Sequence, residues 1–317
     1  MSFGFVFPGQ GSQSIGMLAP LAAAESGEVI RATFDEASAV LGYDLWRLVQ
    51  EGPEDQLNST ERTQPAMLTA GVATWRLWCA RGGGLPSVVS GHSLGEFTAL
   101  VCAGALEFRA AVELVRFRGQ AMQEAVPLGT GAVAAILGLE ETGLEEACRE
   151  AAQGEIVAPA NFNAPGQIVI AGHTAAVQRA IEGAKARGAK RAILLPVSVP
   201  VHTSLMRGAA ERLAGKLKSV EMRRTQIPYI SAVDAAAHQE PADLQELLVR
   251  QLPSPVRWMD TVRALAGTGI AQLVECGPGK VLTGMNRRIE KRPGLEFTAL
   301  EDPASVEAIL AGVKNAQ

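Results

Sequence analysis

The sequence predicts an α/β protein that has one large domain and one smaller inserted domain. Its 317 residues are 47% apolar, which is enough to bury a sizeable core, and only 5% are aromatic. Small and aliphatic residues in this proportion suit helices that pack closely on a sheet. Short apolar runs alternate with segments of helical periodicity along the chain, and near the middle the order changes to βαββαβ.

The first part of the chain is expected to alternate between strands and helices. Residues 3–7, "FGFVF", form an apolar run that ends at Pro8-Gly9, as expected of a buried strand that leads into a loop. Gly42 breaks a helical pattern over residues 28–50, and a second helix over 64–81 stops at a run of glycines. "LPSVVSG" at 85–91 then predicts a short strand, which two helices follow at 94–104 and 107–125.

The middle of the chain predicts a separate small domain. Strands are expected at 131–139, on both sides of 163–166 and at 189–197, with helices at 140–152 and 174–188. Four strands and two helices in about 65 residues match the ferredoxin-like split βαβ unit, which we place at residues 129–196. The large domain is then discontinuous over residues 1–128 and 197–317, and it resumes with strands at 227–233 and 270–276 and a helix at 279–291.

Composition and motifs exclude several classes of function. A formal charge of −4 without long charged runs predicts no nucleic-acid or membrane surface, and no apolar run reaches the length of a membrane helix. Four cysteines without CxxC spacing are expected to be reduced and buried, and the lack of a basic leader predicts a cytoplasmic protein. Scattered histidines and the lack of HExxH, dinucleotide and P-loop motifs predict no metal and no cofactor. Nothing in the sequence requires an oligomer, so we expect a monomer.

Residues 91–95, "GHSLG", form a G-x-S-x-G pentapeptide between a predicted strand and a predicted helix. In such a nucleophile elbow the glycines permit a sharp turn, which exposes the serine, here Ser93, at the carboxyl edge of the sheet. The alternative is a plain turn in which Ser93 only caps the helix. The pentapeptide alone does not decide between these interpretations.

A serine nucleophile needs a general base, and the chain has four histidines. His202 follows an apolar stretch and precedes a predicted helix, which is where a base is expected. His92 is adjacent to the serine on a tight turn and is expected to line the site, whereas His173 and His238 are assigned to capping or surface positions. No acid stands out as a third triad member, and Glu96 is interpreted as a partner of the helix dipole. We therefore expect a dyad whose imidazole is oriented by a backbone carbonyl or an amide.

The oxyanion that forms during acyl transfer needs two aimed donors, and the loss of one costs about 2.7 to 4 kcal/mol of barrier lowering. The elbow supplies the Leu94 N–H. The loop "FPGQGSQ" leaves the first predicted strand at the same edge, and Gln10 lies there between two glycines that leave its N–H accessible. Gln10 and Leu94 are therefore the candidate oxyanion donors.

Six motifs in a fixed order resemble those of the malonyl-CoA:acyl carrier protein transacylase family. They are "FPGQGSQ", "GHSLGE", "RGQAMQEA", "PANFNAPGQ", "VPVH" and "ECGPGKVLTG", and they run from residue 7 to residue 284. The resemblance implies an α/β-hydrolase-like large domain with a ferredoxin-like insert. This agrees with the organisation that the hydrophobic pattern predicts independently.

The resemblance implies that Ser93 is the nucleophile and His202 its base, with Gln10 and Leu94 as the oxyanion hole. Arg118 in "FRGQAMQ" matches the arginine that pairs with the free carboxylate of the malonyl group. From the residues alone, Arg118 is interpreted as a solvated arginine on an amphipathic helix. As a carboxylate partner it would select dicarboxylic acyl groups, because an acetyl group would leave it partly buried and unpaired at a cost of about 3 to 5 kcal/mol.

Further positions follow from the same motifs. Gln251 in "RQLPSPVRW" matches the glutamine whose main-chain carbonyl steadies the histidine, and Asn161 and Asn163 are implied to lie near the mouth of the site. Val201 departs from the family, which often has a small polar residue before the active histidine. Because this side chain can shape the acyl pocket, we expect malonyl as the acyl group and leave methylmalonyl open.

The expected reaction is a ping-pong transfer from malonyl-CoA to the phosphopantetheine thiol of holo acyl carrier protein, in fatty acid or polyketide synthesis. Carrier proteins are acidic, so we expect a local basic rim in spite of the net negative charge. Its candidates are the basic residues of two clusters, Arg187, Lys190, Arg191, Lys280, Arg287 and Arg288. A serine esterase or thioesterase is the alternative function, and a non-catalytic acyl-binding protein is the third.

Overall fold

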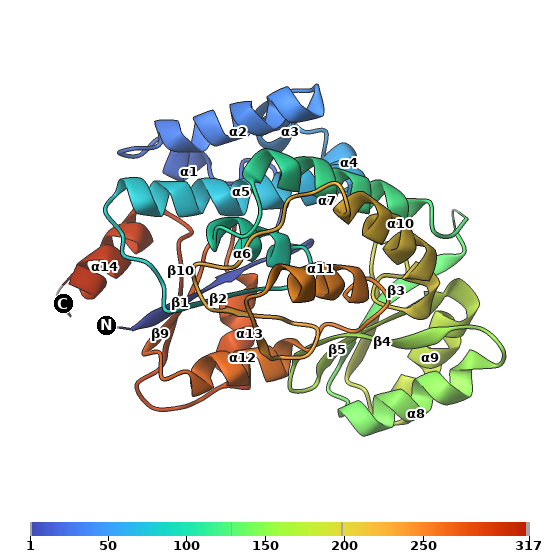
Figure 1. The fold of residues 1–317 in the computed structure, drawn as a ribbon. Coiled ribbons are helices and arrows are strands. Elements are labelled where there is room, and N and C mark those ends of the chain that lie inside the picture. The colour runs from blue at the N-terminus through green and yellow to red at the C-terminus, as the bar shows by residue number, and fades with distance from the viewer. Residues whose placement is uncertain (1, 128, 198, 315–317) are drawn as a thin grey trace.

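A six-stranded sheet runs through the centre of the larger part of the fold (Figure 1). The computed structural model describes residues 2–314 except for Leu128 and Ser198. The strand order is β10-β9-β1-β2-β7-β8, in which only β7 and β8 pair in the antiparallel direction. The strands are β1 (Phe3–Phe7), β2 (Val88–Gly91), β7 (Tyr229–Ile230), β8 (Ala237–His238), β9 (Gln272–Glu275) and β10 (Glu296–Ala299).

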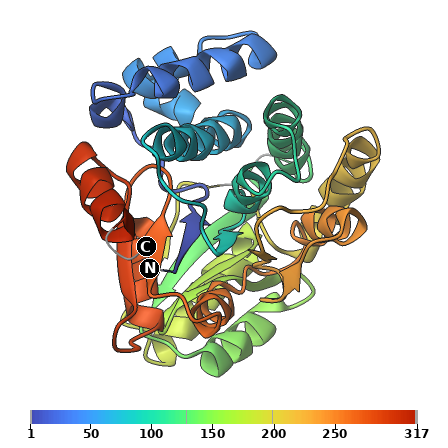
Figure 2. The ribbon, with the colours of Figure 1, turned by 60° about the vertical axis from the view of Figure 1, so that its left-hand side comes forward.

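Both faces of strand β1 are buried, as its apolar sequence predicts. Phe5 and Phe7 pack in a cluster with Trp78 of α5 (Thr60–Ala80). Val6 belongs to another cluster, where Trp258 of α12 (Trp258–Gly267) is its neighbour. Figure 2 shows helices on both sides of this sheet. A mainly parallel sheet that is covered on both faces is an α/β architecture, so the predicted class is confirmed.

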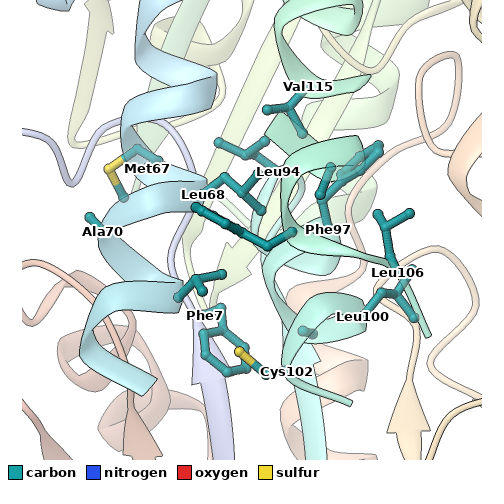
Figure 3. Packing of buried hydrophobic residues seen from close by; sticks show 14 of the residues in the cluster. Phe7, Met67, Leu68, Ala70, Leu94, Phe97, Leu100, Cys102, Leu106 and Val115 are labelled. Carbon is teal, nitrogen blue, oxygen red and sulfur yellow. The ribbon is translucent and has the colours of Figure 1, made fainter. Parts of the chain in front are cut away.

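On the side of Phe7, helix α5 packs against α2 (Glu28–Leu41), α6 (Gly95–Cys102) and α7 (Phe108–Gln123). Figure 3 shows Leu68 of α5 and Phe97 and Leu100 of α6 among the buried side chains of this layer. Among the residues that the structure describes, no helix combines the length and the hydrophobicity that a membrane crossing requires. The other helices of this part are α1 (Ala19–Ala22), α3 (Leu45–Glu51), α4 (Glu54–Leu57), the 3-10 turn η1 (Ser204–Met206), α10 (Arg207–Leu217), α11 (Pro241–Arg250), α13 (Val281–Ile289) and α14 (Pro303–Lys314).

A separate four-stranded antiparallel sheet has the order β4-β5-β3-β6. Helices α8 (Glu141–Ala152) and α9 (Thr174–Ala186) cover one of its faces. The opposite face, with Val133 and Val169, packs against Val201, so it closes over the segment that carries His202. The chain order β3-α8-β4-β5-α9-β6 confirms the predicted βαββαβ pattern. The strands are β3 (Gly131–Leu137), β4 (Val157–Ala164), β5 (Gln167–His173) and β6 (Arg191–Leu194).

Main-chain hydrogen bonds attach the four-stranded sheet to the larger part of the fold. Phe162 N donates to Val256 O, and Val256 N donates to Ala160 O, each at 2.9 Å. Val256 lies just before α12, whose first residue packs under the six-stranded sheet. The strand β4 is therefore held in register with the segment that leads into α12.

Several local features differ from the sequence predictions. Helix α5 begins at Thr60 and not at Gln64. Pro65 lies inside this helix, where it removes one main-chain hydrogen bond but does not end the helix. The strand expected at 227–233 narrows to Tyr229–Ile230, because the chain turns back at Ser231. Cys79 is exposed, contrary to the expectation for all four cysteines, whereas the other three are buried. The short β8 and β10 and the helices α11, α12 and α14 were not predicted.

The turn between β2 and α6 depends on two glycines. A Cβ on Gly91 would lie 1.9 Å from the carbonyl carbon of Gly95, and a Cβ on Gly95 would lie 2.0 Å from the carbonyl oxygen of Phe7. The positive φ of this turn, 52°, belongs to Ser93 and to neither glycine. The glycines therefore permit the helix to pack directly on the strands, while the serine takes the unusual backbone angle.

Replacement of Gly95 by alanine is expected to destabilise the protein by about 1 to 3 kcal/mol, because the new methyl group overlaps a main-chain oxygen. The matched control is Gly215→Ala in α10, where a Cβ has no neighbour within 4 Å. This control should stabilise the fold by up to about 1 kcal/mol, the usual helix preference for alanine over glycine. Urea unfolding of both variants measures the difference, and equal stability of Gly95→Ala and the unchanged protein would contradict the packing argument.

Candidate active site

Ser93 and His202 meet at the carboxyl edge of the six-stranded sheet. Ser93 follows β2 in the turn before α6, and His202 lies between β6 and η1. The Ser93 Oγ and the His202 Nε2 are 2.8 Å apart, which is hydrogen-bond distance. Both residues have left-handed backbone, with φ of 52° and 59°. Such angles are strained in residues other than glycine, and they cluster at functional sites where the surrounding structure enforces them.

Two main-chain carbonyls orient the imidazole of His202. Its Nδ1 lies 3.0 Å from the carbonyl oxygen of Gln251 and 3.1 Å from that of Ser254. Because both neighbours can only accept, Nδ1 carries the proton, and Nε2 is left to accept from the Ser93 hydroxyl. No carboxylate takes part in this contact, which is the arrangement that the sequence analysis expects of a dyad.

The imidazole of His202 is held in its neutral form. The residue is only 4% exposed. Burial, and secondly the nearby guanidinium of Arg118, lowers the pKa of His202 to about 3. The neutral form is the one that accepts a proton, so the resting site is ready to act as a general base.

Arg118 of α7 lies inside the site with 1% of its surface exposed. Nη1 donates to Oε1 of Gln64 at 2.9 Å, and Nη2 donates to Oε1 of Gln251 at 2.7 Å. Nη2 also lies 3.4 Å from the Ser93 Oγ, and the ring of Phe97 is 5.5 Å from the guanidinium carbon. Burial lowers the pKa of Arg118 to about 10, so the side chain stays charged at neutral pH. The interpretation of Arg118 as a solvated arginine is therefore wrong.

The predicted oxyanion donors reach the same cavity as Ser93. Gln10, in the loop after β1, and Leu94, at the start of α6, both line it. Within the described part of the chain, the main-chain N–H of each donates to no acceptor. The positive end of the α6 dipole lies at the same place. An oxygen that develops negative charge beside Ser93 therefore has two candidate donors.

A cavity of about 310 Å³ contains both dyad residues and extends to the four-stranded sheet. The other residues assigned to the lining, His92, Asn161, Asn163 and Val201, also border it. The His92 Nε2 lies 2.8 Å from the Asn163 Oδ1, and Val201 adds apolar surface next to the dyad. Most of the remaining wall is apolar and consists of Met122, Val133, Ala135, Val169, Leu195, Val197, Val281, Leu282 and Met285.

The two basic clusters expected to receive a carrier protein lie on segments that border this cavity. Strand β6 leads into Leu195, and α13 begins with Val281. Lys190 and Arg191 are exposed at the start of β6, of which Arg191 is the first residue. The other four residues have partners, which are Glu150 for Arg187, Glu301 for Lys280, the Phe297 carbonyl for Arg287 and the Gln167 side chain for Arg288. Part of the positive charge of this rim is therefore already engaged.

Two features of polar side chains in the site were missed from the sequence. Gln64 binds Arg118 across 54 positions of sequence, and no local pattern indicates that contact. Glu96 lies in the first turn of α6, as expected of a partner of the helix dipole, but it is 1% exposed, and its burial was not predicted. A signal for its burial was present, because the helical segment "GEFTALVC" has no other charged residue and no polar face for the carboxylate.

These groups can form and release an acyl-serine. A candidate nucleophile, a neutral imidazole, two candidate oxyanion donors and a buried cation surround one cavity. Among the described residues, no three or more His, Cys, Asp or Glu side chains are placed to hold a metal ion.

Known proteins match the chain over nearly its whole length. The family model of the acyl transferase domain matches residues 4–311. The malonyl CoA-acyl carrier protein transacylase of Salmonella typhimurium is 52% identical over 308 residues, which cover 97% of this chain and 98% of that protein. The Bacillus subtilis protein of the same name is 43% identical over 311 residues, with coverages of 98% and 96%.

Solved structures match equally well. An acyl carrier protein S-malonyltransferase from Vibrio cholerae superposes with a TM-score of 0.93 at 54% identity, covering 98% of this chain and 100% of that chain. A type II PKS acyl-carrier protein in complex with its malonyl-transacylase gives a TM-score of 0.95 at 52% identity, with the same coverages. The chain therefore belongs to the malonyl-CoA:acyl carrier protein transacylase family of acyl transferases.

Proposed function

We propose that Ser93, His202 and Arg118 carry out malonyl transfer from malonyl-CoA to acyl carrier protein in this chain. The family membership supplies the reaction, which is that of an acyl-carrier-protein S-malonyltransferase. The observation that carries the residue assignment is the buried guanidinium 3.4 Å from the same Ser93 Oγ that bonds to His202. A buried cation at this place suits an acyl group that ends in a carboxylate.

The first half-reaction loads the serine. His202 Nε2 takes the proton from the Ser93 hydroxyl as Oγ attacks the thioester carbonyl of malonyl-CoA. The N–H groups of Gln10 and Leu94 hold the resulting oxyanion. The carbon–sulfur bond then breaks, the proton on His202 passes to the leaving thiolate, and coenzyme A departs. A malonyl ester on Ser93 remains.

The second half-reaction runs the same steps with a different thiol. The phosphopantetheine thiol of the carrier protein gives its proton to His202, and its sulfur attacks the malonyl ester. The bond to Ser93 breaks, and the serine recovers its proton from the imidazole. The mainly apolar cavity wall favours a thiol on a long arm over free water at this stage.

Arg118 selects the malonyl group because the malonyl carboxylate adds an ion pair to the guanidinium. It does not select by leaving the guanidinium without partners when an acetyl group is bound. From the sequence, an acetyl group is expected to leave the arginine unpaired. In the resting site, Gln64 and Gln251 already accept from both of its Nη atoms. A malonyl carboxylate adds an ion pair to this arrangement, so discrimination against acetyl comes from the strength of that pair.

We also carry the finer fold assignment as a proposal. The larger part is α/β-hydrolase-like, over residues 1–128 and 197–317, and the insert at 129–196 is ferredoxin-like. The separate antiparallel sheet with its two helices on one face supports this division. Leu128, at the predicted boundary, lies outside the described residues. The monomeric state and the cytoplasmic location stay predictions, and the acyl group is expected to serve fatty acid or polyketide synthesis.

The carrier protein is proposed to dock on the basic rim defined above. The relative in complex with a PKS acyl-carrier protein supports a carrier protein as the partner. Lys190 and Arg191 are exposed, and among the described residues their side chains form no hydrogen bond or ion pair. They are therefore the first to test, ahead of the residues that already have partners.

Incubation with malonyl-CoA should add one malonyl group to the protein, and Ser93→Ala should abolish this mass increase. Turnover of that variant should fall by about 10⁴-fold or more, since the nucleophile is lost. Intact-protein mass spectrometry measures the label. When holo carrier protein is added, the malonyl group should move from Ser93 to the thiol of the carrier protein. Rapid loss to water without an acceptor would instead support an esterase, and no label at all would support a binding protein.

The pH profile should report the depressed pKa of His202. A base with a pKa of about 3 stays unprotonated as the pH falls, so kcat/KM for acylation should show no acid limb near pH 6.5. In Arg118→Ala the removal of a neighbouring positive charge favours the imidazolium, so the acid limb should move to higher pH. Single-turnover acylation with acetyl-CoA, which has no carboxylate, measures both profiles. An acid limb that stays at the same pH or moves to lower pH in Arg118→Ala would contradict the assignment of His202 as the base beside Arg118.

Charge reversal at Lys190 and Arg191 together should raise the KM for holo carrier protein by about tenfold and leave the acylation step by malonyl-CoA unchanged. The control is reversal of Arg149 and Lys185, which lie on α8 and α9, over the sheet face opposite the cavity. Steady-state kinetics with varied carrier protein distinguish the two pairs. The docking proposal fails if both pairs give the same KM.

A further inference from the structure

Glu96 is a buried carboxylate below the site that takes no part in the proposed proton transfers. Its Oε1 accepts from the hydroxyls of Tyr229 at 2.5 Å and Ser231 at 2.8 Å, and from the N–H of Ala232 at 2.7 Å. Its Oε2 accepts from Nε2 of Gln251. Burial raises the pKa of Glu96, and these four hydrogen bonds oppose that effect. A carboxylate surrounded by donors is best matched in its ionised form.

The side-chain amide of Gln251 connects Glu96 with Arg118. Besides Glu96, Nε2 donates to the main-chain carbonyl of Ser93 at 2.9 Å. On the other side of the amide, Oε1 accepts from Nη2 of Arg118 at 2.7 Å. Arg118 can only donate, whereas the carboxylate and the carbonyl can only accept. One orientation of the amide therefore satisfies all of these groups.

We propose that Glu96 is a positioning residue for Arg118, which holds the Gln251 amide in the orientation that presents the guanidinium to the carboxylate of the acyl group. This inference rests on the role of Arg118 in the proposed function. Glu96 does not border the cavity, so it acts through Gln251 and not on the substrate. Its negative charge also favours the charged guanidinium, which partly offsets the lowering of the pKa of Arg118 by burial.

The substitution Glu96→Gln tests this link because it creates a conflict between donors. The N–H of Ala232 cannot turn away, so the new amide must direct its oxygen to the position of Oε1. Its NH₂ group then faces Nε2 of Gln251, and two donors oppose each other. A flip of the Gln251 amide only moves the conflict to Arg118 and Ser93. In each arrangement the hydrogen bonding that holds the Arg118 guanidinium in place is weakened.

The experiment compares kcat/KM for malonyl-CoA and for acetyl-CoA, with holo carrier protein as the acceptor. We expect Glu96→Gln to lower the malonyl to acetyl ratio by about tenfold, the cost of one unsatisfied buried donor. Transfer of acetyl should fall much less, because an acetyl group makes no ion pair with Arg118. An equal loss with both acyl groups would overturn the proposal, because a merely structural role lowers both.

Two controls separate positioning from stability. In an Arg118→Ala background, Glu96→Gln should no longer change the ratio, because the group that it positions is gone. Tyr229→Phe removes one donor at Oε1 and leaves the contact of Oε2 with Gln251 in place. It should therefore lower the melting temperature and preserve the ratio. A full effect of Glu96→Gln without Arg118 would contradict the proposal.

If the Glu96→Gln variant does not fold, Glu96→Asp tests the same proposal. The aspartate keeps the charge but is one methylene too short to reach both Ala232 and Gln251, so the ratio should fall again, and an unchanged ratio would overturn the inference. Failure of the proposed function is a separate result. It would appear as an Arg118→Ala variant with an unchanged ratio, whereas failure of this inference alone leaves the Arg118→Ala effect intact.

Discussion

One glutamine at the end of α11 ties together the groups that must act together. The main-chain carbonyl of Gln251 binds His202, and its side-chain amide binds both the Ser93 carbonyl and Arg118. The nucleophile turn, the base and the cation come from three distant parts of the sequence, so their mutual distances depend on this residue. At 2% exposure, Gln251 has no water to replace a lost partner, and each of its polar atoms is committed within the site.

The buried cation and the base oppose each other. A positive charge beside the imidazole weakens His202 as a base, which is the cost of placing Arg118 close enough to meet an acyl carboxylate. A carboxylate that pairs with Arg118 offsets this charge, so the base becomes stronger when a malonyl group is present than when an acetyl group is. In the proposed function, selection by Arg118 and activation of Ser93 are therefore coupled through the electric field of a single side chain.

Local patterns in the sequence were sufficient for the βαββαβ order around the four-stranded sheet and for the candidate dyad residues. The βαββαβ rhythm, the glycine-flanked Ser93 and the position of His202 depend on neighbouring residues, which is why they could be predicted. Contacts between distant segments could not, and the burial of Arg118, its bond to Gln64 and the network of Glu96 all depend on such contacts. The start of α5 was misplaced for a different reason, because a proline inside a helix gives the same local signal as one at its first turn.

The cavity has one wall from each sheet. Ser93 and Arg118 belong to the larger part, whereas Val133, Ala135 and Val169 come from the four-stranded sheet, which the Val256 main-chain bonds hold in register. The atoms proposed to react and the part of the cavity wall proposed to contact the acyl chain therefore come from different stretches of the sequence. With the proposed insert boundaries, exchange of residues 129–196 between relatives would change one wall of the cavity, while Ser93, Arg118 and His202 kept their own sequence neighbours.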